Sequence, residues 1–385
     1  MTQIVDKFSV HKSIAAHEEK NDMRFLRVIF GFGRYIFVTP YELDGKRHLV
    51  KFINVLLLLT LSCYAYLSIS SKVLSTSSMS ITVAIVDYLK VFMDILFLAI
   101  CLSISNIFMS QRWKIFYIKL TQVEMSLRRQ KFQVKKEMYV FYCEVFSVIS
   151  IFAMLHSYEI YAWIQDNGNV LYVYDIVAFL GWTVSHIYMN FILLLIYNFT
   201  QVLKRRYIFL NDMTKTVCEG QVLDEAVASK VNEIISLYKK CFIVVEHFNK
   251  IFGWHMLLYT SVSVVYVLFV IVYSMEMKFH SEKTVPGYLL AADYTISLIV
   301  FILSCNSAEA SGKVIIQTCY LLHESSHSEL VKERLLQLAE YAQHWRPIFS
   351  AAGFYNVNQS TLTAIFEAVI TYLVILIQFS LALQI

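Results

Sequence analysis

Four side chains within apolar stretches of the sequence are of types that bind small molecules: Asp94, Glu159, Trp182 and His186. Ionisable groups are costly inside a lipid bilayer, so by default they indicate a function where they occur. Aromatic rings flanked by carboxylates suit a ligand that has a flat or apolar face and a polar edge. A protonated amine would fit too, because aromatic faces attract cations and a carboxylate would balance the charge. We therefore take these four residues as candidate ligand-binding residues.

Structural roles remain an open alternative for residues of this kind. Asp87, Lys90 and Asp94 are three to four residues apart, so on a helix they can simply pair with one another. Tyrosines such as Tyr172 and Tyr288 are also typical of the aromatic belt at a membrane surface. The ligand class stays open between a bitter, alkaloid-like compound and a sugar.

The elements that must position these residues are seven apolar stretches. The 385-residue chain is 57% hydrophobic and only 16% charged, with a mean hydropathy of +0.55, whereas soluble domains carry about 25% charged residues. A helix needs about 20 apolar residues to cross a bilayer, and a helix satisfies its own backbone there. The sequence therefore predicts an all-α membrane protein with spans at 49–70, 81–109, 138–164, 171–201, 252–274, 287–307 and 361–382.

The distribution of basic residues predicts how these spans are oriented. The segments on one side of the membrane hold 28 Lys and Arg, and those on the other side hold 3. Cytoplasmic loops carry the excess of Lys and Arg. We therefore expect a cytoplasmic N-terminus and an extracellular C-terminus, which is opposite to a G-protein-coupled receptor.

The longer cytoplasmic segments show helical periodicity. Val227, Val231, Ile234 and Tyr238 recur at intervals of three to four within 222–250, and 330–345 has a similar stripe. We expect these apolar faces to pack against each other or against a neighbouring subunit.

Enzyme classes find little support in the sequence. No H-E-x-x-H, G-x-S-x-G or P-loop motif occurs. His323, Glu324 and His327 have the spacing of half a zinc site but lack a third ligand. We expect no enzyme activity, no cofactor, no metal and no nucleic-acid partner.

The last predicted span carries a recognisable motif. Thr371 and Tyr372 are followed by five hydrophobic residues and then by Gln378 and Phe379. This pattern, with the upstream run 349–362, resembles the C-terminal signature of the insect gustatory receptors, which are related to the insect odorant receptors. The specific resemblance covers about the last forty residues, while the length, seven spans and inverted topology agree over the whole chain.

The resemblance implies a plasma-membrane receptor of sensory neurons that forms a homotetramer, or assembles with related receptor subunits, around a central cation pore. Independently, the spacing of Thr371, Ile375 and Gln378 puts them on one face of a helix. Four copies of Ile375 would form an apolar gate and those of Gln378 a polar ring beside it. Without the resemblance, Gln378 would be an interhelical hydrogen-bond partner and Ile375 a packing residue.

The predicted function is therefore a ligand-gated, non-selective cation channel opened by a small-molecule tastant. A G-protein-coupled or metabotropic receptor and a small-molecule transporter remain the alternatives. The predicted organisation is a cytoplasmic segment at 1–48, spans with pocket elements at 49–201, cytoplasmic anchor helices at 202–251, two spans at 252–307, further anchor helices at 308–360 and a pore helix at 361–385.

Overall fold

The computed structural model describes residues 24–35, 81–103, 110–128, 137–166, 173–219, 223–276 and 285–382, with single positions at 52, 56 and 59. Apart from the three single positions, the predicted span 49–70 lies outside these residues. The elements are α2 (Arg24–Tyr35), α4 (Ile81–Ser103), α5 (Ser110–Arg128), α6 (Glu137–Asp166), α7 (Val173–Glu219), α8 (Asp224–Glu276), α9 (Val285–Ser325), α10 (Glu329–His344), β1 (Ser350–Ala351), β2 (Tyr355–Asn356) and α11 (Gln359–Ala382).

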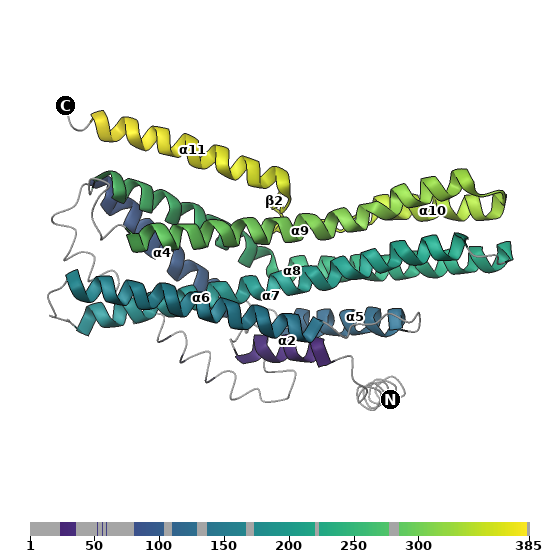
Figure 1. The fold of residues 1–385 in the computed structure, drawn as a ribbon, viewed down its shortest axis with the longest axis horizontal. Helices are drawn as coiled ribbons and strands as arrows, with labels where there is room; N and C mark the ends of the chain where they lie inside the picture. The colour runs from purple at the N-terminus through teal and green to yellow at the C-terminus, as the bar shows by residue number, and fades with distance from the viewer. Residues whose placement is uncertain are drawn as a thin grey trace.

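Three helices run most of the length of the molecule (Figure 1). They are α7, α8 and α9, of 47, 53 and 41 residues. At about 1.5 Å per residue each is about 60–80 Å long, roughly twice the thickness of a bilayer core of about 30 Å. Each must therefore extend well beyond the membrane. The predicted boundaries after residues 201, 251 and 307 consequently fall inside continuous helices and mark no break in secondary structure.

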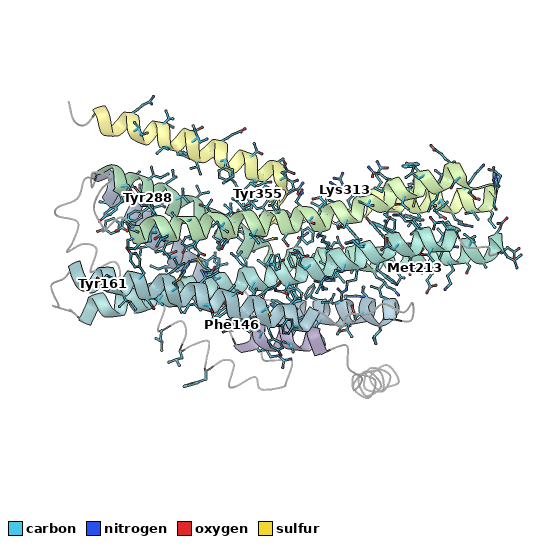
Figure 2. All side chains as sticks on the ribbon, viewed as in Figure 1. Phe146, Tyr161, Met213, Tyr288, Lys313 and Tyr355 are labelled. Carbon is cyan, nitrogen blue, oxygen red and sulfur yellow. The ribbon has the colours of Figure 1, made fainter. Side chains whose placement is uncertain are left out.

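Among the described residues, four stretches are long and apolar enough to cross a membrane: Tyr139–Tyr158, Ser185–Glu219, Asp224–Ser274 and Val285–Ser325. Large apolar side chains stand exposed on α6, with Phe146 72% and Met154 67% accessible. Phe146 is labelled on α6 in Figure 2. Lipid tails are as apolar as these side chains, so a multi-pass membrane protein accounts for their exposure. The orientation and the count of seven remain predictions.

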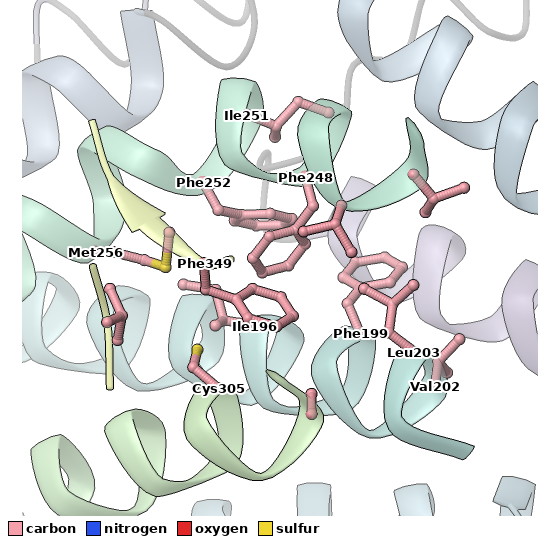
Figure 3. Close-up of a cluster of buried hydrophobic side chains, with 14 of the residues drawn as sticks. Ile196, Phe199, Val202, Leu203, Phe248, Ile251, Phe252, Met256, Cys305 and Phe349 are labelled. Atoms are coloured by element: carbon pink, nitrogen blue, oxygen red, sulfur yellow. The ribbon is translucent and has the colours of Figure 1, made fainter. Parts of the chain in front are cut away.

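The core lies where α7, α8 and α9 pack together near the middle of the molecule. Phe199 of α7, Phe248 and Phe252 of α8, and Phe349 just before β1 are all buried there (Figure 3). The rings of Phe248 and Phe349 meet edge to face, with centroids 5.4 Å apart. Edge-to-face contacts between buried rings add to the free energy gained by burial. The core thus ties the segment leading into α11 to the long helices.

The apolar stripes of 222–250 and 330–345 are buried within one chain. Packing against each other was the first of the two alternatives given for them in the sequence analysis. Val231 and Ile234 of α8 and Leu335 and Leu338 of α10 are fully buried. The Tyr238 hydroxyl donates a 3.1 Å hydrogen bond to the carbonyl of Gly312 in α9. The ends of α7, α8 and α9 and all of α10 therefore form one helical unit at the end of the molecule away from α11 (Figure 1).

A buried ion pair joins α5 to α7. Arg206 Nη2 lies 2.7 Å from Glu124 Oε2, and both side chains are 1% exposed. Arg206 Nη1 also donates to the carbonyl of Val202 at 2.7 Å. Sequence reasoning counted Arg206 only as a basic residue, although its spacing from Leu203 and Leu210, three before and four after, predicts an inward-facing position.

We expect Arg206→Met to lower the free energy of unfolding by about 3–5 kcal/mol, because it leaves the Glu124 carboxylate buried without its partner. Thermal unfolding of the purified protein in detergent would show the loss, and adding Glu124→Leu should recover most of it. The control Lys230→Met removes the exposed pair with Glu233, which contributes about 0–1 kcal/mol. Equal effects of the two single variants would contradict the prediction.

The described residues are nearly all helical, as predicted, and the sequence did not predict the short antiparallel hairpin that β1 and β2 form just before α11. The turn places Ala352 and Gly353 at φ of 53° and 85°, a region that glycine adopts without strain. Asn249 of α8 holds the hairpin: its Nδ2 donates to the Ile348 carbonyl at 2.7 Å, and its Oδ1 accepts from the Ser350 N–H at 3.1 Å. Gly353 in the turn is the local sequence signal that could have indicated a hairpin here.

Gly253 of α8 lets the hairpin approach this closely. A Cβ at this position would lie 2.8 Å from the backbone nitrogen of Ala352, so backbone would have to move. We expect Gly253→Ala to destabilise the protein by about 1–3 kcal/mol, as overpacking does, and to lower its melting temperature. Gly287→Ala is the matched control, because its Cβ would meet only side-chain atoms of Val270 at 3.7 Å or more. Melting temperatures equal to that of the unmodified protein for both variants would contradict the prediction.

Candidate functional site

Ionisable and aromatic side chains from five helices meet at the end of the molecule where α4 and α6 lie. We call this set the outer cluster: Asp87, Lys90 and Asp94 of α4, His156 of α6, His186 of α7, Tyr266 of α8, and Asp293 and Tyr294 of α9. Tyr288 and Tyr161 lie towards the same end, whereas Met213 and Lys313 lie towards the other (Figure 2).

His186 links three of the helices. Its Nε2 lies 3.1 Å from Oδ2 of Asp293, with the histidine 1% and the carboxylate 19% exposed. The His156 and His186 rings stack with centroids 5.3 Å apart, and the Tyr294 ring lies 5.0 Å from His186. A carboxylate that accepts from one ring nitrogen fixes the orientation of the imidazole. The orientations of these buried rings are therefore fixed by their contacts with one another.

Lys90 is held against aromatic rings and not only against its acidic neighbours. Its Nζ lies 5.0 Å from the ring centroid of Tyr266 and 4.9 Å from that of Phe269. Tyr266 in turn packs against Tyr294 at 4.6 Å. Cation–π contacts within about 6 Å are favourable, more so away from water. The rings of Tyr266 and Phe269 therefore hold the ammonium group of Lys90 by cation–π contact.

Asp94 is the least satisfied member of the outer cluster. Its side chain is 1% exposed, and neither carboxylate oxygen has a hydrogen-bond partner among the described residues. It interacts electrostatically with Lys90 and Asp87. Buried polar groups in proteins are nearly always hydrogen-bonded, and an exception requires an explanation. A ligand that donates a hydrogen bond to Asp94 is one such explanation.

The ring of Tyr294 lies against His186 and interacts electrostatically with Asp94. The structure thus brings together these two of the four candidate ligand residues. Glu159 and Trp182 lie on α6 and α7, but their side chains are outside the described part of the structure. Sequence reasoning did not select Asp293, whose role depends on a contact across 107 residues. The local sequence around Asp293 would equally suit a carboxylate that faces water at the membrane surface.

The signature residues lie on α11, which extends away from the bundle (Figure 1). Leu362 and Ile365 near its start pack against the core. Thr371, Ile375 and Gln378 are all exposed, Ile375 by 39%. Tyr372 is 55% exposed, and the Phe379 side chain lies outside the described part. The face predicted to line a pore therefore makes little contact with its own chain.

The start of α11 is fixed by polar contacts to the rest of the chain. The Asn358 Oδ1 accepts from the Thr361 N–H at 3.2 Å, as an N-cap does. The Gln359 N–H donates to Asn306 Oδ1 of α9 at 3.3 Å. Together with Asn249 at the hairpin, these contacts anchor one end of α11 and leave the other projecting.

Comparison with known proteins agrees with this arrangement. The sequence pattern of the 7tm chemosensory receptor family matches residues 26–383. The chain belongs to this family. The receptor is 26% identical over 142 residues to the candidate gustatory receptor 28b of Drosophila melanogaster, and 27% identical over 194 residues to the candidate gustatory receptor 2a. The matches cover 34% and 43% of this receptor and 30% and 45% of those relatives, less than half of either.

The fold is that of a solved insect receptor. The olfactory receptor OR5 from Machilis hrabei superposes with a TM-score of 0.60, over 92% of this receptor and 98% of that chain, at 15% identity. Its complex with eugenol gives a TM-score of 0.59 over 92% and 97% of the chains, at 16% identity. These similarities show that the chain has the fold of this olfactory receptor.

Proposed function

We propose that this receptor is a gustatory receptor that acts as a ligand-gated, non-selective cation channel in the plasma membrane of sensory neurons. The observation that carries the proposal is the exposed face of α11. Thr371 and Gln378 are polar and project from an apolar helix, and polar groups in membrane helices face a bundle interior or a water-filled cavity. A ring of four such helices, one from each identical or related subunit, supplies that cavity.

In this arrangement Ile375 closes the pore and Gln378 faces hydrated cations. Apolar constrictions gate by losing water, and amide groups can replace part of an ion's hydration shell. The cytoplasmic helical unit of α7 to α10 joins the subunits below the membrane. The orientation follows the excess of basic residues, with the N-terminus in the cytoplasm and the C-terminus outside.

The outer cluster is the proposed binding site for the tastant. Asp94 accepts a hydrogen bond or balances a positive charge, while His186 and Tyr294 offer ring faces. The complex of the similarly folded OR5 with eugenol supports a small organic ligand. Ligand binding opens the channel only if the ligand contacts the open state better than the closed one. The hairpin held by Asn249 connects α8, which contributes Tyr266, to the start of α11.

Whole-cell recording from cells that express this receptor alone, with G-protein signalling blocked, tests the proposal. Bitter compounds and sugars are applied in turn, and surface expression is measured in the same cells. A non-selective cation current evoked by one class of compound is the expected result and also identifies the tastant. A current abolished by the block would favour a G-protein-coupled receptor, and uptake without current would favour a transporter.

A further inference from the structure

Glu367 is an acidic residue within the apolar stretch of α11, the helix that carries the proposed pore face. It lies eight residues after Gln359, which is about 12 Å along the helix axis from the start of α11. The predicted span 361–382 therefore places its carboxylate within the bilayer. A carboxylate is unfavourable there unless it pairs with a cation or faces water.

No cation pairs with Glu367 in the part of the chain that the structure describes. Its side chain is exposed, and its carboxylate makes no hydrogen bond or ion pair with the described residues. A neighbouring subunit offers little at this depth, because the seven predicted spans together contain two Lys or Arg residues, Lys51 and Lys90. Lys90 belongs to the outer cluster, where it lies over aromatic rings. Water is therefore the surrounding that suits Glu367.

The direction of Glu367 around α11 matches that of the predicted pore residues. At about 100° per residue, Glu367 is turned about 40° from Thr371 and about 20° from Gln378. Leu362 and Ile365, which pack against the core, lie about 140–160° away from Glu367 around the helix. The carboxylate therefore points to the same side as Thr371 and Gln378, away from its own bundle.

Glu367 precedes the proposed gate along α11. Ile375 follows it by eight residues, so about 12 Å of helix separates the carboxylate from the proposed constriction. In the proposed orientation α11 begins at the cytoplasmic end of its span. A cation that enters from the cytoplasm would therefore meet Glu367 before it meets Ile375.

We propose that Glu367 sets the charge selectivity of the channel, because four carboxylates around the inner half of the pore attract cations and repel anions. This inference rests on the proposed function, since only the assembled pore brings the four side chains together. Rings of Asp or Glu line the filters of cation channels. Clefts lined by charge of one sign raise the local concentration of counter-ions about 10–1,000-fold. Thr371 and Gln378 are uncharged and supply no such field.

Water access to Glu367 can be tested without any tastant. Glu367→Cys is treated, in inside-out membrane vesicles, with a membrane-impermeant methanethiosulfonate that carries a sulfonate. We expect modification, because this face lines a pore that is open to the cytoplasm below the gate. Phe366→Cys is the matched control, since Phe366 is 42% exposed at the same depth but is turned about 100° away. The unmodified receptor corrects for native cysteines such as Cys143, which is exposed on α6.

Charge selectivity is read from the reversal potential with different NaCl concentrations on the two sides of the membrane. The recordings use the Ile375→Ala background, in which the proposed gate is open. There we expect Glu367→Gln to lower the permeability ratio of Na⁺ to Cl⁻ about tenfold, and Glu367→Asp, which keeps the charge, to preserve it. The loss should shrink in 1 M salt, where the Debye length is about 3 Å. Glu340→Gln is the control, since Glu340 is exposed on α10 and lies outside the pore helix.

The outcomes separate the selectivity role of Glu367 from the channel itself. Equal modification of Glu367→Cys and Phe366→Cys, or none of either, would overturn the inference. So would a current whose permeability ratio is unchanged by Glu367→Gln, although that current would leave the proposed channel intact. Modification of Glu367→Cys without current, either from tastants or from Ile375→Ala at the cell surface, would overturn the proposed channel and the selectivity role with it.

Discussion

Channels with Ile375→Ala should conduct without ligand. In the proposed pore, the four Ile375 side chains form the apolar constriction that keeps water out of the closed state. Truncation to alanine widens the constriction and removes apolar surface, which favours the hydrated, conducting state. We expect the resting current to rise about tenfold, which corresponds to a shift of about 1.4 kcal/mol in the closed–open equilibrium. The measurement is the whole-cell current before ligand is added, normalised to surface expression.

Ile370→Ala is the matched control for this prediction. Ile370 is an exposed isoleucine of the same helix, 62% accessible against 39% for Ile375. Five residues separate the two, which turns their side chains about 140° apart around α11. If only the face of Thr371, Ile375 and Gln378 lines the pore, Ile370→Ala leaves the resting current unchanged. An unchanged current in Ile375→Ala, or equal currents in both variants, would remove Ile375 from the gate.

The helices themselves were largely predictable because lipid leaves the backbone few alternatives. The length of the apolar stretches predicted the helices. The spacing of Val231, Ile234 and Leu335 correctly predicted which faces are buried. What the sequence could not predict was the continuity of α7, α8 and α9 past the membrane surface. The composition changes from apolar to charged where the surroundings change from lipid to water. A helix can continue across that boundary without a break.

The contacts of the candidate site were less predictable than its residue types. Asp94 and His186 were selected because ionisable groups are rare in apolar segments, which is a local property. The pairing of His186 with Asp293, and the position of Lys90 over Tyr266, depend on how helices far apart in sequence are packed. The close approach of Ala352 to Gly253 was unpredictable for the same reason, because a glycine within a helix does not show which backbone segment packs against it.

Asp94→Asn should abolish the preference of the receptor for a positively charged agonist. The substitution keeps the size and shape of the side chain and removes its charge, so a fold that tolerates the buried carboxylate should tolerate the amide. A ligand ammonium bound at Asp94 loses its counter-charge, and breaking a buried charge pair costs about 2–5 kcal/mol. We expect the concentration for half-maximal current to rise at least about thirtyfold for an amine tastant.

This prediction has two controls, of which one is a second ligand and the other a second variant. A neutral tastant of the same shape, in which a hydroxyl replaces the amine, should shift little, because the asparagine amide still accepts a hydrogen bond. His255→Asn provides the second control, since His255 is also fully buried but its Nδ1 donates within α8, to the Ile251 carbonyl at 3.1 Å. Equal shifts for the charged and neutral tastants would mean that Asp94 acts on gating and not on binding. The charge-selective shift is decisive because a change in the closed–open equilibrium affects both ligands alike, whereas a lost counter-charge affects only the amine.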